Sequence, residues 1–238
     1  LAAADQATDT PTNNFCIINP ISNFDPSNKS TLSEGNLYYA SVQGGYGVLY
    51  GSMGPSSGKW YFEAQYVSGN MHGNSSNVGL MIGIMGSTYN LASSGPGDSD
   101  FAHGYIGYGG GYANAGTNTS WGSGDSGTAG DIAMCAFDLD NNKIYWGFNG
   151  TWDNSSNPAS GTNGVTIADP SLTDLGAYYP IISDRSSVRS YVYAYNFGGC
   201  PSFAISSGNA DGNGYGNFEY APPSGFYSLC TKNLAEYG

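Results

Sequence analysis

One serine in this sequence lies in a tetrapeptide of catalytic type. Residues 124–127 read Gly-Asp-Ser-Gly, the segment that surrounds the nucleophile of trypsin-like proteases. Such a serine needs a histidine as general base and a buried acid behind it. The chain has 2 histidines, His72 and His103, and neither lies in that family's histidine motif. Because the surrounding segment is rich in Gly and Ser, the string arises easily by chance, and we expect a loop here.

A second pattern has the appearance of a calcium loop. Residues 209–214 (Asn-Ala-Asp-Gly-Asn-Gly) carry side-chain oxygens at alternate positions and a glycine at the sixth. The twelfth position of such a loop needs a bidentate acid, but it is Tyr220, and Glu219 falls one residue early. The flanking helices are also missing. We expect a turn-rich surface loop here and, by the same reasoning, around Asp98 and Asp100.

The other reactive side chains are poorly spaced for catalysis. Asp138 and Asp140 alternate along a predicted strand, so their carboxylates point to opposite faces and cannot work as an acid–base pair. No two of the four cysteines form the CxxC pair of zinc and redox sites. These cysteines are Cys16, Cys135, Cys200 and Cys230. We therefore expect no catalytic residues, no metal and no cofactor, and the sequence disfavours a glycan depolymerase.

Aromatic residues in one Gly-rich region are candidates for binding a partner. Five of them lie in or beside residues 86–130: Tyr89, Tyr105, Tyr108, Tyr112 and Trp121. Rings on loops stack on sugars or anchor protein partners. The alternative is that some of these rings fill the edges of the fold. We predict that this region forms the partner-contacting surface.

Composition decides the class of fold that carries these rings. The 238 residues include 37 glycines and 20 tyrosines, and only 10% of them are charged. This composition is poor for helices and favours short strands joined by tight turns.

The net charge of −12 disfavours the binding of nucleic acid, because phosphates require a basic surface. The longest apolar stretch, residues 78–85, is far shorter than the roughly 20 residues that cross a bilayer. We expect no membrane insertion.

Alternating residues predict individual strands. In residues 59–67 one face carries large apolar groups, namely Trp60, Phe62, Ala64 and Tyr66. In residues 78–85 the apolar side chains of Val78, Leu80, Ile82 and Ile84 fall on one face. The opposite face, with Gly79, Met81, Gly83 and Met85, has little bulk, which indicates a close neighbour there. Residues 131–140 and 143–150 read as a hairpin around a two-residue Asn141-Asn142 turn, with Trp146 and Phe148 in the core. Two further strands are expected over residues 178–184 and 191–197. The second carries aromatic residues along one side, namely Tyr191, Tyr193, Tyr195 and Phe197.

Four of these segments, in this order, resemble the SPRY family. They are residues 57–63 (Ser-Gly-Lys-Trp-Tyr-Phe-Glu), 104–108, the hairpin 130–150, and 179–183 followed by Asn-Phe-Gly at 196–198. The resemblance covers about residues 57–199. It implies an antiparallel β-sandwich of the concanavalin-like type, which agrees with the all-β class that the composition favours, and we expect one such domain over residues 15–238. Residues 1–14 are small and polar and cannot bury enough apolar area to fold alone, so we expect an extended arm there. The resemblance also implies binding through loops rather than catalysis.

The two flanks resemble the ends of SPRY-like modules in structural proteins of tailed phages. They are residues 10–20 and 222–234. This resemblance implies a phage virion protein, part of the capsid surface, a fibre or the tail, located on the extracellular particle. Its partners would be other virion proteins, further copies of itself, or a host-surface protein or glycan. The alternative is a lectin-like carbohydrate-binding module of a secreted protein.

The SPRY resemblance also predicts paired termini. Such sandwiches bring their terminal strands together, so residues 15–18 are expected beside residues 228–230. Cys16 and Cys230 would then be close, and an oxidising setting could join them in a disulfide. Cys135, within a strand that is apolar on both faces, is expected to remain a buried thiol.

Overall fold

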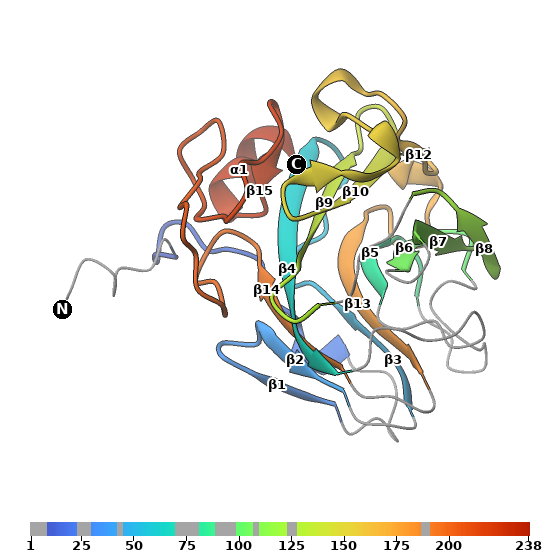
Figure 1. Ribbon diagram of the computed structural model, residues 1–238. Helices are drawn as coiled ribbons and strands as arrows, with labels where there is room; N and C mark the ends of the chain where they lie inside the picture. The colour runs from blue at the N-terminus through green and yellow to red at the C-terminus, as the bar shows by residue number, and fades with distance from the viewer. Residues whose placement is uncertain are drawn as a thin grey trace.

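The computed structural model describes residues 9–22, 30–41, 45–69, 81–88, 99–106, 110–122, 128–186 and 191–238. Their strands form two sheets that pack against each other (Figure 1). Neighbouring strands run antiparallel, apart from the short β15 (Tyr227–Ser228), which pairs in parallel with β4 (Lys59–Gly69). The predicted all-β sandwich is confirmed.

The larger sheet contains the predicted hairpin. In spatial order its strands are β1 (Thr31–Ser33), β2 (Tyr38–Ala40), β14 (Tyr191–Asn196), β4, β9 (Ile132–Asp138), β10 (Lys143–Phe148) and β11 (Thr151–Trp152), with β12 (Val165–Thr166) beside β10. The smaller sheet is β3 (Gly45–Tyr50), β13 (Tyr179–Ser186), β5 (Met81–Met85), β6 (Ala102–Ile106), β7 (Gly111–Asn114) and β8 (Thr117–Ser120). Among the described strands, β8 and β11 therefore end their sheets.

The described helices are short, as the sequence predicts. One α-helix, α1 (Thr231–Tyr237), follows β15. The 3-10 turns are η2 (Pro20–Ser22), η5 (Asp153–Ser155), η6 (Pro158–Ser160) and η7 (Pro170–Leu172). Of these, η5 directly follows β11 and contributes to the candidate site.

The interior is built from the predicted alternating residues. The inward side chains of β4 are Trp60, Phe62, Ala64 and Tyr66, all at most 4% exposed. Those of β14 and the residue after it are Tyr191, Tyr193, Tyr195 and Phe197. Both sets belong to one apolar cluster that also contains Leu49, Ile82 and Ile182 from the smaller sheet. Both predicted alternations are confirmed.

Strand β5 shows why a glycine lies at the centre of one of its faces. Gly83 pairs with Gly104 of β6, and a Cβ at Gly83 would overlap the carbonyl oxygen of His103. Only glycine permits this approach between neighbouring strands. The close neighbour that the sequence indicates is therefore present, while residues 78–80 of the predicted strand lie outside the described residues.

Trp146 joins the two sheets through the interior. Its indole Nε1 donates to the backbone oxygen of Ile82 at 3.0 Å, and its side chain is 1% exposed. Buried tryptophan generally needs such a partner. Cys135 lies opposite Trp146 in register and is fully buried, which raises the pKa of its thiol. The predicted buried thiol is confirmed.

The β9–β10 hairpin has a longer turn than predicted. Asp138 pairs with Lys143, so residues 139–142 form a four-residue loop instead of a two-residue turn. The Asp138 carboxylate accepts two hydrogen bonds from Asn141, each of 2.9 Å, and forms an ion pair with Lys59 at 2.9 Å. These contacts hold Asp138 in the strand, and the reversal is centred one residue earlier in the chain than predicted.

The C-terminal segment covers the outer face of the larger sheet. Phe218 and Phe226 from this segment pack on Tyr61, Met134, Ala136 and Tyr145. Strand β4 is therefore buried on both faces, whereas its sequence pattern indicated a core on one. This cover explains why the side chain of Tyr61, on the outer side of β4, is 0% exposed.

Glu63 anchors this cover. Its side chain is 0% exposed, and its carboxylate accepts hydrogen bonds from the backbone N–H groups of Glu219 and Tyr220 at 3.0 and 2.8 Å. Tyr61 and Asn196 donate to the same carboxylate from the sheet at 2.9 and 3.2 Å. Burial raises the pKa of Glu63 to about 7 even though these four donors act in the opposite direction.

The termini pair as predicted. Phe15 forms a β-bridge with Cys230, and the Cys16 N–H donates to the Leu229 carbonyl at 2.8 Å. The predicted disulfide is absent, because Cys16 and Cys230 are both free, buried thiols. The register gives the reason: Phe15 is opposite Cys230, so the next residue points to the other side of the strand. The Cys16 sulfur instead accepts a hydrogen bond from Ser52 at 3.8 Å.

The end of the predicted N-terminal arm belongs to the fold. Asn13 is 4% exposed, and its Oδ1 accepts from the Lys232 N–H at 3.1 Å, which caps the first turn of α1. The Thr231 N–H donates to the Asn14 carbonyl at 2.9 Å. Asn13 and Asn14, at the end of the predicted arm, are therefore bonded to α1, while residues 1–8 lie outside the described residues.

The buried imidazole of His103 makes the stability of the protein depend on pH. It is 4% exposed, its two ring nitrogens have no hydrogen-bond partner among the described residues, and burial lowers its pKa to about 4. Its contribution to stability is therefore present above its ordinary pKa of about 6.5 and is lost as the pH falls toward 4.

We expect His103→Phe to remove this loss of stability at low pH. Relative to the variant, wild type should lose about 3 kcal/mol of unfolding free energy between pH 7 and pH 4. Urea denaturation across this range measures the difference, and a constant difference would contradict the buried neutral imidazole.

Candidate functional site

The five rings predicted to contact a partner have different positions. Tyr89 and Tyr108 lie outside the described residues. Tyr105 is 3% exposed within the interior cluster, so this part of the prediction is wrong, because β6 directs its side chain inward. Tyr112 and Trp121 are half-buried against the same cluster.

The structure has a hollow between the end strands of the two sheets. Its volume is about 830 Å³, and it is lined by residues 120–122, which include the end of β8, and by residues 151–155, which form β11 and η5. All four residues of β8 are exposed. The hollow therefore opens where the described parts of both sheets end, and the Trp121 side chain is part of its lining.

Asp153 fastens the η5 side of the hollow to the smaller sheet. Its Oδ2 accepts from the Tyr105 hydroxyl at 2.6 Å, and its Oδ1 accepts from the Asn154 N–H at 2.8 Å. Gly122 leaves room for this carboxylate, since a Cβ there would overlap Asp153. Tyr105 thus contributes to the site from inside the core, by holding the acid in place.

Asn154 holds the Trp121 side of the hollow. In the orientation that its neighbours dictate, its amide nitrogen donates to the Trp121 carbonyl at 3.0 Å and its amide oxygen accepts from the Trp121 indole N–H at 3.1 Å. The backbone of this turn is strained, because Asn154 and Ser155 have φ values of 55° and 50°. Non-glycine residues rarely adopt such values, which persist where the surroundings enforce them.

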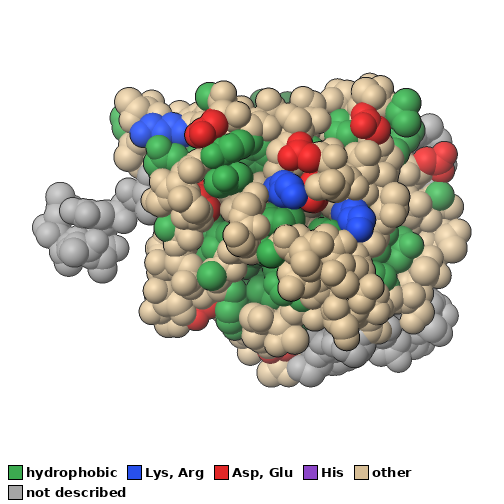
Figure 2. Space-filling model, turned by 90° about the horizontal axis from the view of Figure 1, so that it is seen from above, with side chains coloured by type: hydrophobic (Ala, Val, Ile, Leu, Met, Phe, Trp, Pro, Cys, Tyr) green, Lys and Arg blue, Asp and Glu red, His purple; other side chains and the backbone are tan. Residues whose placement is uncertain are grey.

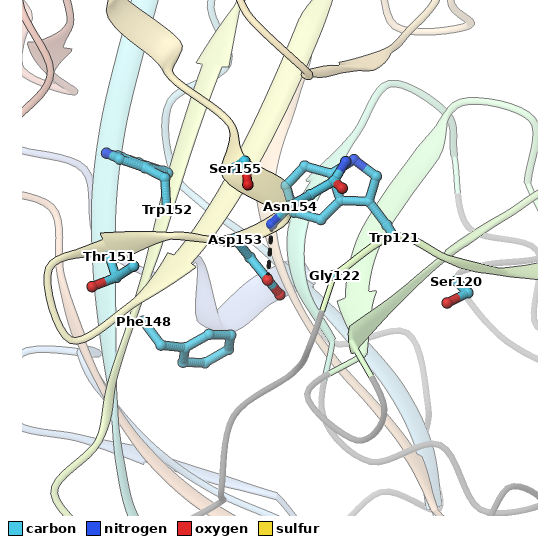
Figure 3. Close-up of a pocket in the computed structure, with 9 residues that line it drawn as sticks. All are labelled: Ser120, Trp121, Gly122, Phe148, Thr151, Trp152, Asp153, Asn154 and Ser155. Carbon is cyan, nitrogen blue, oxygen red and sulfur yellow. Dashed lines mark hydrogen bonds between the residues drawn. The ribbon is translucent and has the colours of Figure 1, made fainter.

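Two rings border the space around Asp153. Figure 3 shows the Asp153 carboxylate directed between Phe148 and Trp121, while Trp152 points away from it. Phe148 packs 5.3 Å from the Tyr105 ring, and Trp121 stands edge-on to Trp146 at 5.6 Å. Both half-buried rings of the hollow are therefore supported from behind by buried aromatic side chains.

Sequence reasoning missed the side of this site that Phe148 and residues 151–155 form. Phe148 was expected in the core, but it is half-buried and lines the hollow. Residues 151–155 carry no motif and no alternation, so nothing singled them out. The available signal was local: asparagine tolerates positive φ, and Asn149 and Asn154, with φ of 48° and 55°, flank β11.

The calcium-like loop is closed to a cation. The Asp211 carboxylate accepts hydrogen bonds from the N–H groups of Asn213, Tyr215 and Ser228 at 2.9 to 3.0 Å. Asn233 and the Ser228 hydroxyl also donate to it. Glu219 turns away and accepts from the Ser206 N–H at 2.6 Å. The loop is thus a structural turn, as predicted.

Other functional chemistry finds little support among the described residues. They contain no group of three His, Cys, Asp or Glu side chains arranged to hold a metal ion. The Gly-Asp-Ser-Gly segment and His72 lie outside them. Positive side chains on the face in Figure 2 stand apart, with acidic side chains near them, instead of forming a basic patch. No described helix has the length and apolar character needed to span a bilayer.

Comparisons with known proteins identify the fold. No protein-family model matches the chain, and no curated protein matches it. Among solved structures, the chain is similar to the SPRY domain of human HERC1, with a TM-score of 0.52 and 18% sequence identity over 79% of this chain and 99% of that chain. The fold is therefore a SPRY-type β-sandwich, which confirms the resemblance at the level of fold.

The Tyr105–Asp153 hydrogen bond gives a prediction for the site. Tyr105→Phe leaves the ring in the core but removes the donor to Asp153. We expect the free energy of unfolding to fall by about 1–3 kcal/mol, as is typical when a carboxylate loses a buried donor. The matched control is Tyr112→Phe on the adjacent strand, which should change stability by less than about 0.5 kcal/mol. Equal effects of the two variants would show that the Asp153 contact does not secure the hollow.

Proposed function

We propose that this chain is a non-enzymatic structural protein of a tailed-phage virion, located on the capsid surface, a fibre or the tail. Its sandwich would mediate subunit assembly or attachment to the host surface, and the hollow between β8 and η5 would be its contact surface. The observation that carries the proposal is this hollow, a preorganised aromatic and polar recess at the exposed edge of a SPRY-type sandwich.

The absence of catalysis is part of this proposal. Glu63, the acid whose pKa burial raises to about 7, lies under the C-terminal cover with its carboxylate engaged by four donors. His103 is enclosed in the interior. Titratable groups with shifted pKa values are candidates for catalysis only where a substrate can reach them. Neither of these groups lines the hollow.

The virion setting is supported by the flanks. The two segments whose sequences resemble the ends of phage modules lie side by side, through the Phe15–Cys230 bridge and the bonds of Asn13 and Asn14 to α1. A module whose ends meet on one side can be inserted in a longer chain or joined to neighbours while its opposite edge stays accessible.

The alternative is a lectin-like module of a secreted protein. It is favoured by the pairing of exposed rings with hydroxyl, amide and carboxylate groups around one hollow. Both proposals use the same recess for binding, so they differ in where the protein is found.

Labelling of particles tests the virion proposal. An antibody raised against the purified chain should decorate tailed-phage particles from the same source at regularly repeated positions in immunogold electron micrographs. The control is antibody that has been pre-absorbed with the chain. Recovery of the chain only as free protein, with no labelled particles, would contradict the virion proposal and favour the secreted module.

A further inference from the structure

We propose that the hollow between β8 and η5 binds a neutral, hydroxyl-rich saccharide. This inference rests on the proposed function, in which the hollow is the contact surface, and adds the chemical class of the ligand. Saccharides offer C–H faces that pack on aromatic rings and hydroxyl groups that exchange hydrogen bonds with acids and amides. The hollow presents both kinds of partner.

The apolar part of the site consists of Phe148 and Trp121. Both are half-buried, so their exposed surfaces face a recess while buried rings of Tyr105 and Trp146 hold them from behind. The Asn154 amide fixes the indole of Trp121 through the 3.1 Å bond to its N–H. Rings held in this way lose little conformational entropy when a ligand packs on them.

The polar part consists of Asp153 with Asn154 and the hydroxyl groups of the rim. The Asp153 carboxylate is positioned between the two rings by Tyr105 and by the Asn154 N–H. Ligand hydroxyl groups are hydrogen-bond donors of the kind that this carboxylate accepts. Ser120, Thr151 and Ser155 add donors and acceptors around the opening.

The negative charge of the lining favours neutral saccharides over anionic ones. Among the described residues that line the hollow, Asp153 is the only charged one, and none of them is Lys or Arg. The chain as a whole carries −12. Sialylated, sulfated or phosphorylated ligands would meet a negative site without a cation to compensate them. The volume of about 830 Å³ accommodates a short oligosaccharide and exceeds what one inserted amino-acid side chain would fill.

An extended peptide is the competing occupant, since β8 is the last described strand of its sheet and could accept an added strand. Pairing on β8 would use its backbone and its four exposed polar side chains. It would leave the rings and Asp153 without a specific role. The fixed positions of these side chains therefore favour the saccharide.

A glycan array followed by titration tests the inference. The purified chain is applied to an array of neutral, sialylated and sulfated glycans, and the strongest neutral ligand is titrated by calorimetry at low and high salt. We expect binding to neutral glycans only, with an affinity that salt does not change. Trp121→Ala and Phe148→Leu should each weaken binding about tenfold or more. Phe148→Leu keeps most of the apolar volume, so it stays informative where Trp121→Ala impairs folding.

The matched control is Tyr237→Ala, which removes a half-buried ring that stacks on Tyr227 at 4.1 Å, away from the hollow. It should leave glycan affinity unchanged. Failure of every neutral glycan to bind, or binding that the Trp121 and Phe148 variants do not alter, would overturn the saccharide. If Trp121→Ala particles lose attachment to host cells while no glycan binds, the proposed function stands and the ligand is a peptide or protein.

Discussion

The hydrogen bond from the Trp146 indole to the Ile82 carbonyl is the contact on which the arrangement of the molecule depends. It crosses the interior at 3.0 Å and fixes the larger sheet against the smaller one. Tyr105, Tyr112 and Trp121 pack around the same indole. Since Tyr105 also holds Asp153, the geometry of the hollow follows from the packing of the core. A site built on such rigid strands needs little reordering when it binds.

Much of the fold could be predicted because burial leaves a period of two in a strand. The inward residues of β4 and β14 were indicated by alternation, and the hairpin of β9 and β10 by two apolar runs around a short turn. The cover on the outer face of β4 could not be, because Phe218 and Phe226 reach it from a segment with no regular pattern. The four-residue turn was missed because the bonds of Asp138 outweigh the turn preference of the two asparagines.

The candidate site was predictable in part. Trp121 was identified because a large ring in a Gly-rich region is conspicuous. Tyr105 was misplaced because the sequence does not distinguish a ring on a loop from a ring on a strand such as β6. Residues 151–155 became functional candidates only when the fold brought them beside residues 120–122. Such proximity between distant segments is a property of the tertiary structure, as is the strained turn that positions Asp153.

The most direct measurement of the central claim is the indole N–H spectrum of nitrogen-labelled protein, mixed with solubilised surface polysaccharide of host cells. The 4 tryptophans give one signal each. If the hollow is the binding surface, the Trp121 signal shifts as polysaccharide is added, while that of Trp60, whose N–H is bonded to the Ser57 carbonyl beside α1, stays in place. A complex that leaves the Trp121 signal unchanged, or that shifts Trp60 instead, would contradict the account.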